Sequence, residues 1–515
     1  MRRGTFLKGH RSARPPFALA AWHFGYCMRT ALWHSPLVFG RTPKQSKTAG
    51  VTTIGDPMRR RRPARGDREP VIWFEVEDLL RYFDHFDNPT GLQRVSLEIL
   101  TEAERLYGAA GRARFCRLSV YTKKLTPIDF DAIVSAYRDP PGKNAPWTNI
   151  WAPAHVWNDV FNLAVTMLRH PRFFFRIFKT ALRDIVDIKM PHRRFEQHAR
   201  PGDVVVSLGA SWAIPDYMRH IGEAKRQLGI KFSFLLHDLI PLQNESFVEQ
   251  WHVTKFRAWL EQAIPTADTI FTVSKHSRDA LLSSAVDAKY TLPPVETLEP
   301  GAGLSDRPLA GEPTESSFPD RFVLFVSTIE IRKNHRLLVR VWRRLIERHG
   351  ADAVPTLVFA GRLGWLVDDL LAELAAANYL DGKIRIMTGM SDVELREAYR
   401  SCLFTVFPSL SEGWGLPIAE SLIHGKLCAA SDIAPCREIG GDFIDYFDPA
   451  DDEDALAKIE KLLLDADHVA AKEARLRSDY RPRAWADCVH ALILALGGPA
   501  SQDVAPSFSV AAGGQ

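Results

Sequence analysis

The chain has 515 residues, of which 46% are hydrophobic and 25% charged, and its formal net charge is +4. These values are those of an ordinary globular protein and exclude a chain that is disordered or membrane-embedded throughout. Because the charge is close to balanced, composition gives no support for nucleic acid binding by the whole molecule. A single hydrophobic core stops growing at roughly 250–300 residues, so we expect two domains with additional terminal segments.

The first 70 residues are rich in Arg, Pro and Gly, and their weakly apolar stretch, residues 18–24, contains a histidine. Such a stretch makes a poor signal-peptide core, so we expect a disordered extension over 1–70 or a translation start at Met58. No run of 18 apolar residues occurs, which argues against a transmembrane helix. The six cysteines are scattered without metal-ligand spacing, so neither a zinc site nor a disulfide framework is predicted, and a reducing cytosol fits best.

A first domain is predicted over residues 71–305. It begins with VIWFEV (71–76), a short β-branched and aromatic run that is typical of a buried strand. Three similar runs follow at 203–208, 231–237 and 269–273. Helical spacing appears between the runs and after the last one, where we interpret Ser274 and Ser277 as capping residues. Strands that alternate with helices indicate a parallel sheet.

A second domain is predicted over residues 321–480, after a linker at 306–320 that is dense in Pro and Ser. Its five strand-like runs lie at 322–327, 356–361, 383–387, 403–407 and 426–431. Helical segments between them predict another doubly wound α/β unit. We expect a final helix over 481–497, ended by a glycine, and a disordered tail over 498–515.

The segment SEGWGLPIAES (411–421) follows a predicted buried strand and places Glu412 and Glu420 eight residues apart. Gly413 and Gly415 permit a tight turn and close approach to a ligand, and the proline after them suits the first turn of a helix. A helix that starts at the carboxyl end of a strand offers N–H groups to a diphosphate. The two glutamates are then explained as acceptors for sugar and ribose hydroxyls. Alternatively, they are solvated residues that favour the helix dipole.

The segment VSTIEIRKNH (326–335) places Arg332 and Lys333 after the first strand of the second domain, where a helix is predicted to begin. Cations are unfavourable near a helix N-terminus, so a bound anion that compensates for them explains their presence better. The alternative is a solvated charge pair on a loop.

Three shorter turns carry further candidates. Gly91 precedes a predicted helix, with Thr90 available as its cap; His237 and Asp238 follow a buried strand; Gly361 follows another. Taken singly, a histidine after a strand is more often structural, and a glycine there is as often an ordinary turn. The sequence DFD (129–131) superficially matches a metal-binding D-x-D motif, but it lies outside any predicted strand end, and no metal site is expected.

The 411–421 segment resembles the E-x7-E motif of retaining glycosyltransferases of family 4, which have the GT-B fold: two Rossmann-like domains facing across a cleft. The resemblance covers roughly residues 71–495 and is sharpest in the second domain. It implies that Glu412 contacts the donor sugar and Glu420 the ribose. Gly413, Trp414, Gly415 and Leu416 are accordingly predicted to line the donor site.

The resemblance extends to other segments. Residues 326–335 are similar to the family's E-x-R-K-N/G segment, which implies that Arg332 and Lys333, with Lys333 preferred, neutralise the donor pyrophosphate. Many members carry an arginine where this chain has Ser327 or Thr328, and Ser327 is predicted to bind the donor.

In the first domain, the resemblance implies that Gly91 belongs to a loop that covers the donor phosphates. It also implies that His237 lies near the sugar and acceptor as a catalytic group, and that Gly361 contacts the nucleotide.

Residues 161–200 carry nine Lys or Arg against three acids, interleaved with aromatic and aliphatic side chains. This composition is typical either of contact with an anionic membrane surface or of a core helix with a solvated basic edge. The family resemblance does not extend to this feature.

These features predict a metal-independent glycosyltransferase without a cofactor. It would move a hexose, with mannose and GDP-mannose favoured, to a hydroxyl of a growing polysaccharide or lipid-linked glycan, with retention of configuration. The nearest resemblance is to mannosyltransferase-like enzymes of bacterial surface polysaccharide synthesis. A cytoplasmic location, at or near the inner face of the membrane, is expected, and no nucleic acid partner. The alternatives are epimerase-like or phosphorylase-like chemistry on the same fold, or a catalytically silent nucleotide-sugar-binding partner.

Overall fold

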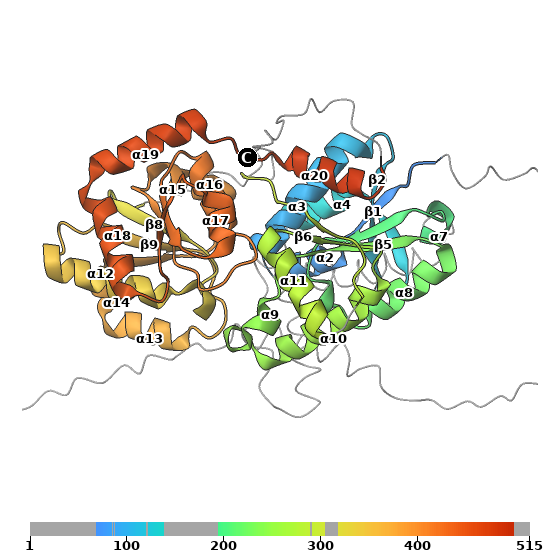
Figure 1. The fold of residues 1–515 in the computed structure, drawn as a ribbon, viewed down its shortest axis with the longest axis horizontal. Helices are drawn as coiled ribbons and strands as arrows, with labels where there is room; N and C mark the ends of the chain where they lie inside the picture. The colour runs from blue at the N-terminus through green and yellow to red at the C-terminus, as the bar shows by residue number, and fades with distance from the viewer. Residues whose placement is uncertain are drawn as a thin grey trace, which may run out of the picture. The chain divides into compact units, whose positions relative to one another are not determined.

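The computed structural model describes residues 68–138, 194–303 and 318–498, except positions 85, 87, 120, 121, 289 and 290. From Glu69 onward these residues belong to one compact unit, so the contacts given below lie within that unit. Figure 1 labels many of its helices and strands. The N-terminal extension up to residue 67, most of the basic 161–200 stretch, most of the linker and the tail from 499 lie outside the described residues.

The first lobe is built on a seven-stranded sheet with the order β3-β2-β1-β4-β5-β6-β7. All neighbours are parallel except β2 and β3, which are antiparallel. The central strands β1 and β4 are buried along their whole length, which explains why each begins with three apolar residues in a row. The strands are β1 (Ile72–Glu75), β2 (Ala113–Leu118), β3 (Leu125–Ile128), β4 (Val204–Ser207), β5 (Lys231–Leu236), β6 (Thr269–Thr272) and β7 (Val295–Thr297).

Helices cover both faces of this sheet because successive strand residues point to opposite sides. Phe74 packs in one apolar cluster with α2, α3 and α4, and Trp73 packs in another with α7, α8 and α10. The helices are α2 (Glu77–Phe83), α3 (Gly91–Ala103), α4 (Phe130–Arg138), α7 (Phe195–His198), α8 (Tyr217–Leu228), α9 (Ile240–Gln243), α10 (Gln250–Thr266) and α11 (Lys275–Ala288). A π-helical segment, Glu104–Gly108, extends α3, and 3-10 turns lie at Ser211–Ala213 and Glu245–Phe247.

The second lobe is built on a six-stranded, all-parallel sheet with the order β10-β9-β8-β11-β12-β13. Its strands are β8 (Phe322–Val326), β9 (Thr356–Ala360), β10 (Ile384–Met387), β11 (Thr405–Phe407), β12 (Cys428–Ser431) and β13 (Asp445–Phe447). The connecting elements are a 3-10 turn (Ile331–Lys333) and α12 (His335–His349), α13 (Asp368–Ala376), α14 (Asn378–Asp381), α15 (Asp392–Ser401), α16 (Leu416–Ile423), α17 (Ala434–Gly440), α18 (Asp452–Leu464) and α19 (Ala466–Asp479). Helices α12 and α18 pack on one face and α15 on the other.

The last helix, α20 (Trp485–Ala495), packs against α3 of the first lobe. Its buried Val489 and Leu492 belong to the same apolar cluster as Phe74. The C-terminal helix α20, which follows the last strand of the second sheet, therefore contributes to the hydrophobic core of the first lobe.

The predicted fold class, two Rossmann-like α/β lobes, is confirmed by these two sheets. Each of the nine predicted strands is present within two residues of its expected bounds, and Ser274 caps α11 by accepting the N–H of Ser277 at 3.0 Å. Four strands were not predicted: β2, β3, β7 and β13. In β2, charged Arg114 and Arg117 interrupt the apolar run, and β13 has only three residues, so their partners in the sheet stabilise strands that carry weak signals of their own.

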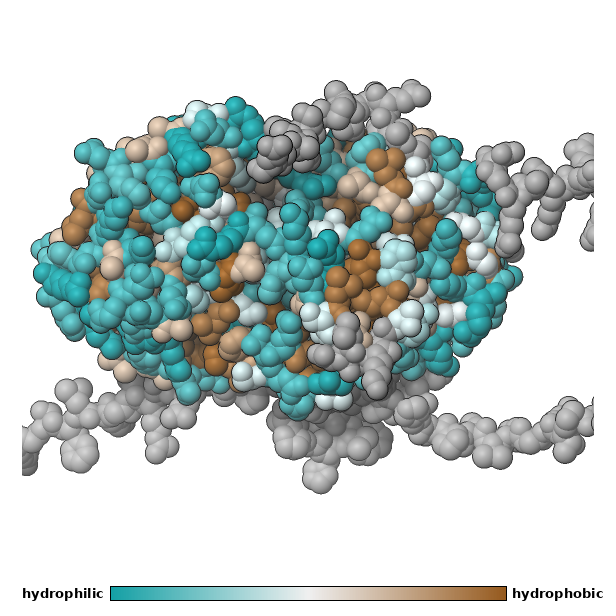
Figure 2. All heavy atoms as spheres, in the orientation of Figure 1, coloured by the Kyte–Doolittle hydropathy of each residue, from teal (hydrophilic) through white to brown (hydrophobic). Residues whose placement is uncertain are grey.

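The face shown in Figure 2 is mostly hydrophilic, with separate hydrophobic patches. Within the described part of the chain, none of the helices combines the length and the hydrophobicity that crossing a bilayer requires.

Candidate active site

Two loops of the second lobe meet at the point where the strand order of its sheet reverses, between β8 and β11. Strand β8 lies between β9, the next strand in the chain, and β11, so the connections after β8 and β11 leave the sheet on opposite sides. In open parallel sheets, ligands bind in the crevice that forms at such a point, at the carboxyl ends of the strands. The β8 loop carries Arg332 and Lys333, and the β11 loop carries Glu412. A backbone hydrogen bond of 2.9 Å from Leu410 N–H to the Arg332 carbonyl oxygen joins the two loops.

Arg332, Lys333 and Glu412 form one charged cluster. The Lys333 Nζ lies 2.5 Å from Glu412 Oε1, and an Arg332 guanidinium nitrogen lies 2.8 Å from Glu412 Oε2. A second guanidinium nitrogen of Arg332 lies 2.7 Å from Glu330 Oε1. The side chain of Glu412 is 8% exposed, that of Lys333 12% and that of Arg332 16%, so the cluster is largely shielded from water.

Burial and pairing set the charges of the cluster. Burial by itself would raise the pKa of Glu412, but Arg332 and Lys333 outweigh it and hold that pKa below its usual value. Burial and the neighbouring Arg332 lower the pKa of Lys333. The carboxylates of Glu330 and Glu412 already pair with these two cations. The expectation that a bound anion compensates for the cations stays a prediction.

The β11 loop also touches the first lobe at His237. A Cβ added to Gly413 would lie 2.0 Å from the His237 carbonyl oxygen, so only glycine fits at this approach. The hydroxyl of Ser277, on α11, donates to the same carbonyl oxygen at 3.1 Å and lies 3.4 Å from the Gly413 carbonyl oxygen. Ser277 thus does more than the capping role expected for it, because it bridges segments of both lobes.

The imidazole of His237 lies in a fixed environment. Its Nε2 is 2.8 Å from the carbonyl oxygen of Leu208, which can only accept, so Nε2 carries the proton and Nδ1 has the free lone pair. Burial lowers the pKa of His237 to about 4, and the ring is neutral at pH 7. Burial raises the pKa of the adjacent Asp238, while Arg332 opposes that rise, so this carboxyl group is within electrostatic reach of the cluster.

Helix α16 begins immediately after the β11 loop, as expected, with Pro417 in its first turn. A Cβ on Gly415 would lie 3.2 Å from the Ile439 side chain. Leu416 is 8% exposed and joins the apolar cluster of the first lobe, against which Trp414 also packs. The buried Trp414 Nε1 has no hydrogen-bond partner among the described residues. These two predicted donor-lining residues therefore also hold the loop against the first lobe.

Glu420 lies apart from the Glu412 contacts, in a separate cluster. Its Oε2 accepts a hydrogen bond of 2.7 Å from the Tyr399 hydroxyl on α15, and the residue is 5% exposed. Burial raises the pKa of Glu420, and Arg94 of α3 and the Tyr399 hydroxyl oppose the rise. The two glutamates of the motif thus have different partners, Arg332 and Lys333 for Glu412 and Tyr399 for Glu420.

The remaining predicted residues lie on neighbouring turns. Ser327 and Gly361 directly follow β8 and β9 and lie side by side, since a Cβ on Gly361 would lie 1.9 Å from the Ser327 carbonyl oxygen. Gly91 is the first residue of α3, and an added Cβ there would meet no described atom within 4 Å. Thr90 occupies the N-cap position but makes no side-chain cap bond; its hydroxyl contacts the Gln93 side chain instead.

Several charged or phenolic residues of these clusters were not singled out from the sequence. Glu330 lies within the basic segment and Arg94 within PTGLQR, so both motifs could have suggested them. Asp392 and Tyr399 lie on α15, in a segment without a recognisable motif. Only their positions next to Arg94 and Glu420 reveal them.

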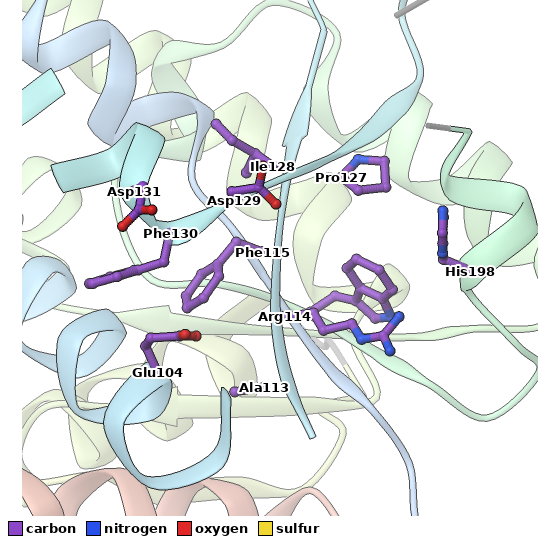
Figure 3. Close-up of a pocket in the computed structure, with 11 residues that line it drawn as sticks. Glu104, Ala113, Arg114, Phe115, Pro127, Ile128, Asp129, Phe130, Asp131 and His198 are labelled. Carbon is purple, nitrogen blue, oxygen red and sulfur yellow. The ribbon is translucent and has the colours of Figure 1, made fainter. Parts of the chain in front are cut away.

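A cavity of about 500 Å³ lies elsewhere, at the β2–β3 edge of the first sheet (Figure 3). None of the predicted site residues lines it. Asp129 and Asp131 of the DFD sequence do, and β3 ends at Ile128, so the expectation that DFD lies outside a strand end is wrong. Among the described residues, no group of three or more His, Cys, Asp or Glu is placed to hold a metal ion.

The second lobe is similar to a glycosyltransferase family. Residues 312–480 match the family described as "Glycosyl transferases group 1". This range contains the charged cluster at the switch point, Glu420, Gly361 and Ser327. This match and the curated relatives support the expected enzyme class, a glycosyltransferase.

The curated relatives include bacterial mannosyltransferases. The chain is 28% identical over 272 residues to "Serotype-specific mannosyltransferase WbdA" of Escherichia coli, which covers 50% of this chain and 32% of that protein. It is 30% identical over 167 residues to "O-antigen chain mannosyltransferase B" of Escherichia coli, which covers 32% of this chain and 43% of that protein. The chain thus spans 32% and 43% of the length of these two relatives.

A solved structure shares the fold of both lobes. The Anabaena protein HepE, in complex with UDP and glucose, aligns with a TM-score of 0.50 and 13% identity, over 82% of this chain and 98% of its own. This similarity supports the GT-B arrangement of two α/β lobes.

Proposed function

We propose that the chain is a retaining mannosyltransferase of the family 4 type. It would transfer mannose from GDP-mannose to a hydroxyl of a growing polysaccharide or lipid-linked glycan, without a metal ion. The observation that carries this proposal is the largely buried contact of Arg332 and Lys333 with Glu412 at the switch point of the second sheet.

The charged cluster suits a reaction in which a diphosphate leaves. When the glycosidic bond breaks, negative charge grows on the nucleotide diphosphate, and preorganised cations in a water-poor site stabilise it most effectively. Among the described residues, Lys333 forms an ion pair with Glu412 alone, whereas Arg332 forms ion pairs with both Glu330 and Glu412. We therefore infer that the diphosphate takes Lys333 from Glu412 and that the released carboxylate accepts a hydroxyl of the donor sugar.

The acceptor would approach along the first lobe at His237. Because this ring is neutral with its Nδ1 lone pair free, it can accept a hydrogen bond from a hydroxyl group. With a pKa of about 4 it is a weak base, so we infer that it orients the acceptor hydroxyl and does not remove its proton before attack.

Mannose is the preferred sugar because the curated relatives are described as mannosyltransferases. The HepE complex holds UDP and glucose, which makes UDP-glucose the comparison donor. A polysaccharide acceptor fits the O-antigen named for one relative. The expected contact of residues 161–200 with an anionic membrane stays a prediction, since nearly all of that stretch lies outside the described residues.

The test incubates the purified chain with GDP-mannose, UDP-glucose or dTDP-glucose, octyl α-mannoside as acceptor, and EDTA. We expect a new α-mannoside from GDP-mannose, identified by NMR of its anomeric proton, at a rate unchanged by EDTA. A β-linked product would overturn retention, and loss of activity in EDTA would overturn metal independence. An epimerised sugar, a sugar phosphate made in added phosphate, or donor binding without turnover would instead support one of the alternative functions.

A further inference from the structure

The first sheet has a switch point of its own. Strand β1 lies between β2, the next strand in the chain, and β4, and the helices that follow β1 and β4 cover opposite faces of the sheet. Strand β1 thus has the same place in its sheet as β8 has in the second, where the charged cluster lies. Open α/β sheets bind ligands at such points, at the carboxyl ends of the strands.

Asp78 lies at this switch point. It belongs to the first turn of α2, shortly after β1 ends, and its Oδ2 accepts the N–H of Ala210, in the turn after β4, at 2.7 Å. Gly209 leaves room for this bond, since an added Cβ there would lie 1.9 Å from the same oxygen. Asp78 therefore joins the connections after β1 and β4, as the bond from Leu410 to Arg332 joins those after β8 and β11.

The carboxylate of Asp78 has no cation beside it. Among the described residues it forms no ion pair, whereas the neighbouring Glu77 pairs with Arg81 and Arg117. Asp78 is partly exposed, and a carboxylate has about four acceptor positions, so the bond from Ala210 leaves it able to accept others. Burial raises its pKa to about 6 against the opposing backbone N–H groups, so it is mostly ionised at pH 7. Hydrogen bonds that a ligand donates to such a group are strong ones.

His237 and Asp78 flank the same turn. Strand β4 lies between β1 and β5, which precede these two side chains. Nε2 of His237 bonds the carbonyl oxygen of Leu208 in this turn at 2.8 Å. The backbone of His237 in turn lies against Gly413 of the β11 loop. Direct contacts therefore connect Asp78, through the turn after β4 and His237, to the loop of the second lobe that carries Glu412.

We propose that Asp78 is an acceptor-binding residue, whose carboxylate accepts a hydrogen bond from a second hydroxyl of the acceptor sugar while His237 orients the hydroxyl that attacks. Two fixed points on one sugar ring define its orientation, which one hydrogen bond does not. This inference rests on the proposed function, in which the acceptor is a glycan that binds along the first lobe. It adds the switch point of the first sheet to the acceptor site.

The rival explanation is that Asp78 only fixes the turn after β4. A structural residue and a residue that touches the sugar differ in what they do to acceptor selectivity. Losing a structural residue would lower transfer to every acceptor by the same factor, whichever hydroxyl the acceptor lacks. Losing a residue that touches the sugar would remove the benefit of one particular hydroxyl.

The probes are octyl α-mannoside and its 2-, 3-, 4- and 6-deoxy analogues, with the donor that the wild type transfers best and kcat/KM as the readout. In the wild type, the analogue that lacks the attacked hydroxyl should be inactive. A second analogue should have a kcat/KM about 10- to 100-fold below that of octyl α-mannoside, since hydrogen bonds to charged groups are among the stronger ones.

Asp78→Asn should lower kcat/KM for octyl α-mannoside by a similar factor. In this variant the second analogue should come to within about threefold of octyl α-mannoside, because the substitution and the missing hydroxyl remove the same bond. The affinity for GDP, measured by calorimetry, should stay within about twofold of the wild-type value, because the proposed nucleotide site lies on the second lobe.

The matched control is Asp203→Asn. Asp203 directly precedes β4, at the opposite end of that strand, is 1% exposed, and accepts the N–H groups of Val71 and Arg200 at 3.1 and 2.9 Å. This variant should lose stability and keep the wild-type ratios between the analogues. Thermal unfolding of each variant shows whether the protein remains folded, and Asp78→Ser takes the place of Asp78→Asn should the amide unfold it.

Three outcomes overturn the inference. Wild-type kcat/KM in Asp78→Asn shows that Asp78 does not contact the acceptor. A loss by one common factor for octyl α-mannoside and all its active analogues shows that Asp78 is structural. A wild type in which only the attacked hydroxyl matters shows that the sugar is not held at a second point. If the wild type makes no glycoside from any of the donors, the proposed function fails together with the inference, and this result is distinct from the other three.

Discussion

Gly413 lies directly against the backbone of His237, so closely that a Cβ at position 413 would be 2.0 Å from the His237 carbonyl oxygen. The two residues follow strands of different sheets, β11 and β5. The absence of a side chain at Gly413 therefore lets the loop that carries Glu412 approach the loop that carries His237.

Gly413→Ala should force these two loops apart. Overpacking of this kind costs about 1–3 kcal/mol of stability, and a shift of a catalytic loop by about 1 Å can cost about 100-fold in rate. We expect a lower melting temperature and a large loss of kcat with GDP-mannose, measured by thermal unfolding and initial rates.

Gly222→Ala is the matched control for this change, because an added Cβ there meets only the Arg226 side chain, at 3.5 Å. It lies inside α8, where alanine is favoured over glycine by about 1 kcal/mol. Its stability should be equal to or above that of the wild type. Wild-type kinetics and stability in Gly413→Ala would show that the loops do not depend on this contact.

Lys333→Met should reduce turnover about 100- to 1,000-fold, the usual cost of losing one preorganised group that stabilises developing negative charge. The measurement is kcat with GDP-mannose and octyl α-mannoside. Lys225→Met removes an ion pair of similar length that is more exposed: Lys225 Nζ lies 2.6 Å from Asp268 Oδ2 in the first lobe, and the side chains are 28% and 35% exposed. That variant should lose stability but keep kcat near the wild-type value; equal losses of kcat in both variants would argue against a specific role for Lys333.

Glu75 should make the first lobe less stable as the pH rises. It is 1% exposed at the end of β1, and burial raises its pKa from 4.5 to about 8. Because the folded pKa lies above the unfolded one, the fold favours the neutral acid. That contribution is complete below about pH 4.5 and is lost as the pH rises through 8.

Glu75→Gln tests this linkage with a neutral side chain of the same shape. Unfolding by urea at pH 5 and pH 8.5 should show a fall in the unfolding free energy of the wild type that exceeds that of the variant by about 3–5 kcal/mol. The pKa of Asp78, raised to about 6 by burial, contributes to both proteins alike. Parallel pH dependences would mean that Glu75 is ionised in the fold.

His237 should be a neutral, Nε2-protonated ring throughout the neutral range, because Nε2 bonds the Leu208 carbonyl oxygen and burial lowers its pKa to about 4. NMR of ¹⁵N-histidine-labelled protein, with His237→Asn to assign the signal, should show this tautomer from pH 8 to pH 5. Since its folded pKa is below the unfolded value of 6.5, the stability it contributes is lost as the pH falls from 6.5 towards 4. An imidazolium signal at pH 6 would contradict this assignment.

Local patterns in the chain predicted the repetitive parts of the fold. The nine predicted strands are found because most lie inside parallel sheets, where both faces are buried and the run is apolar without interruption. Strand β2 was not predicted because it contains the charged Arg117. The structure accommodates this charge by pairing it with Glu77, which lies 40 residues earlier in the chain. A charged residue within a strand makes the segment resemble a loop in the sequence, because its ion-pair partner is not apparent there.

The sequence by itself determined the two-lobed α/β architecture, the helix that starts after Gly415 and the residue types of the charged cluster, because each of these is encoded by neighbours along the chain. Only the tertiary structure decided the pairings between distant segments: Glu412 with Arg332, Arg94 with Asp392, and Gly413 with His237. Electrostatic and steric contacts depend on distance in space. Residues that are 79 or 298 positions apart in the chain share no sequence periodicity from which such a contact could be predicted.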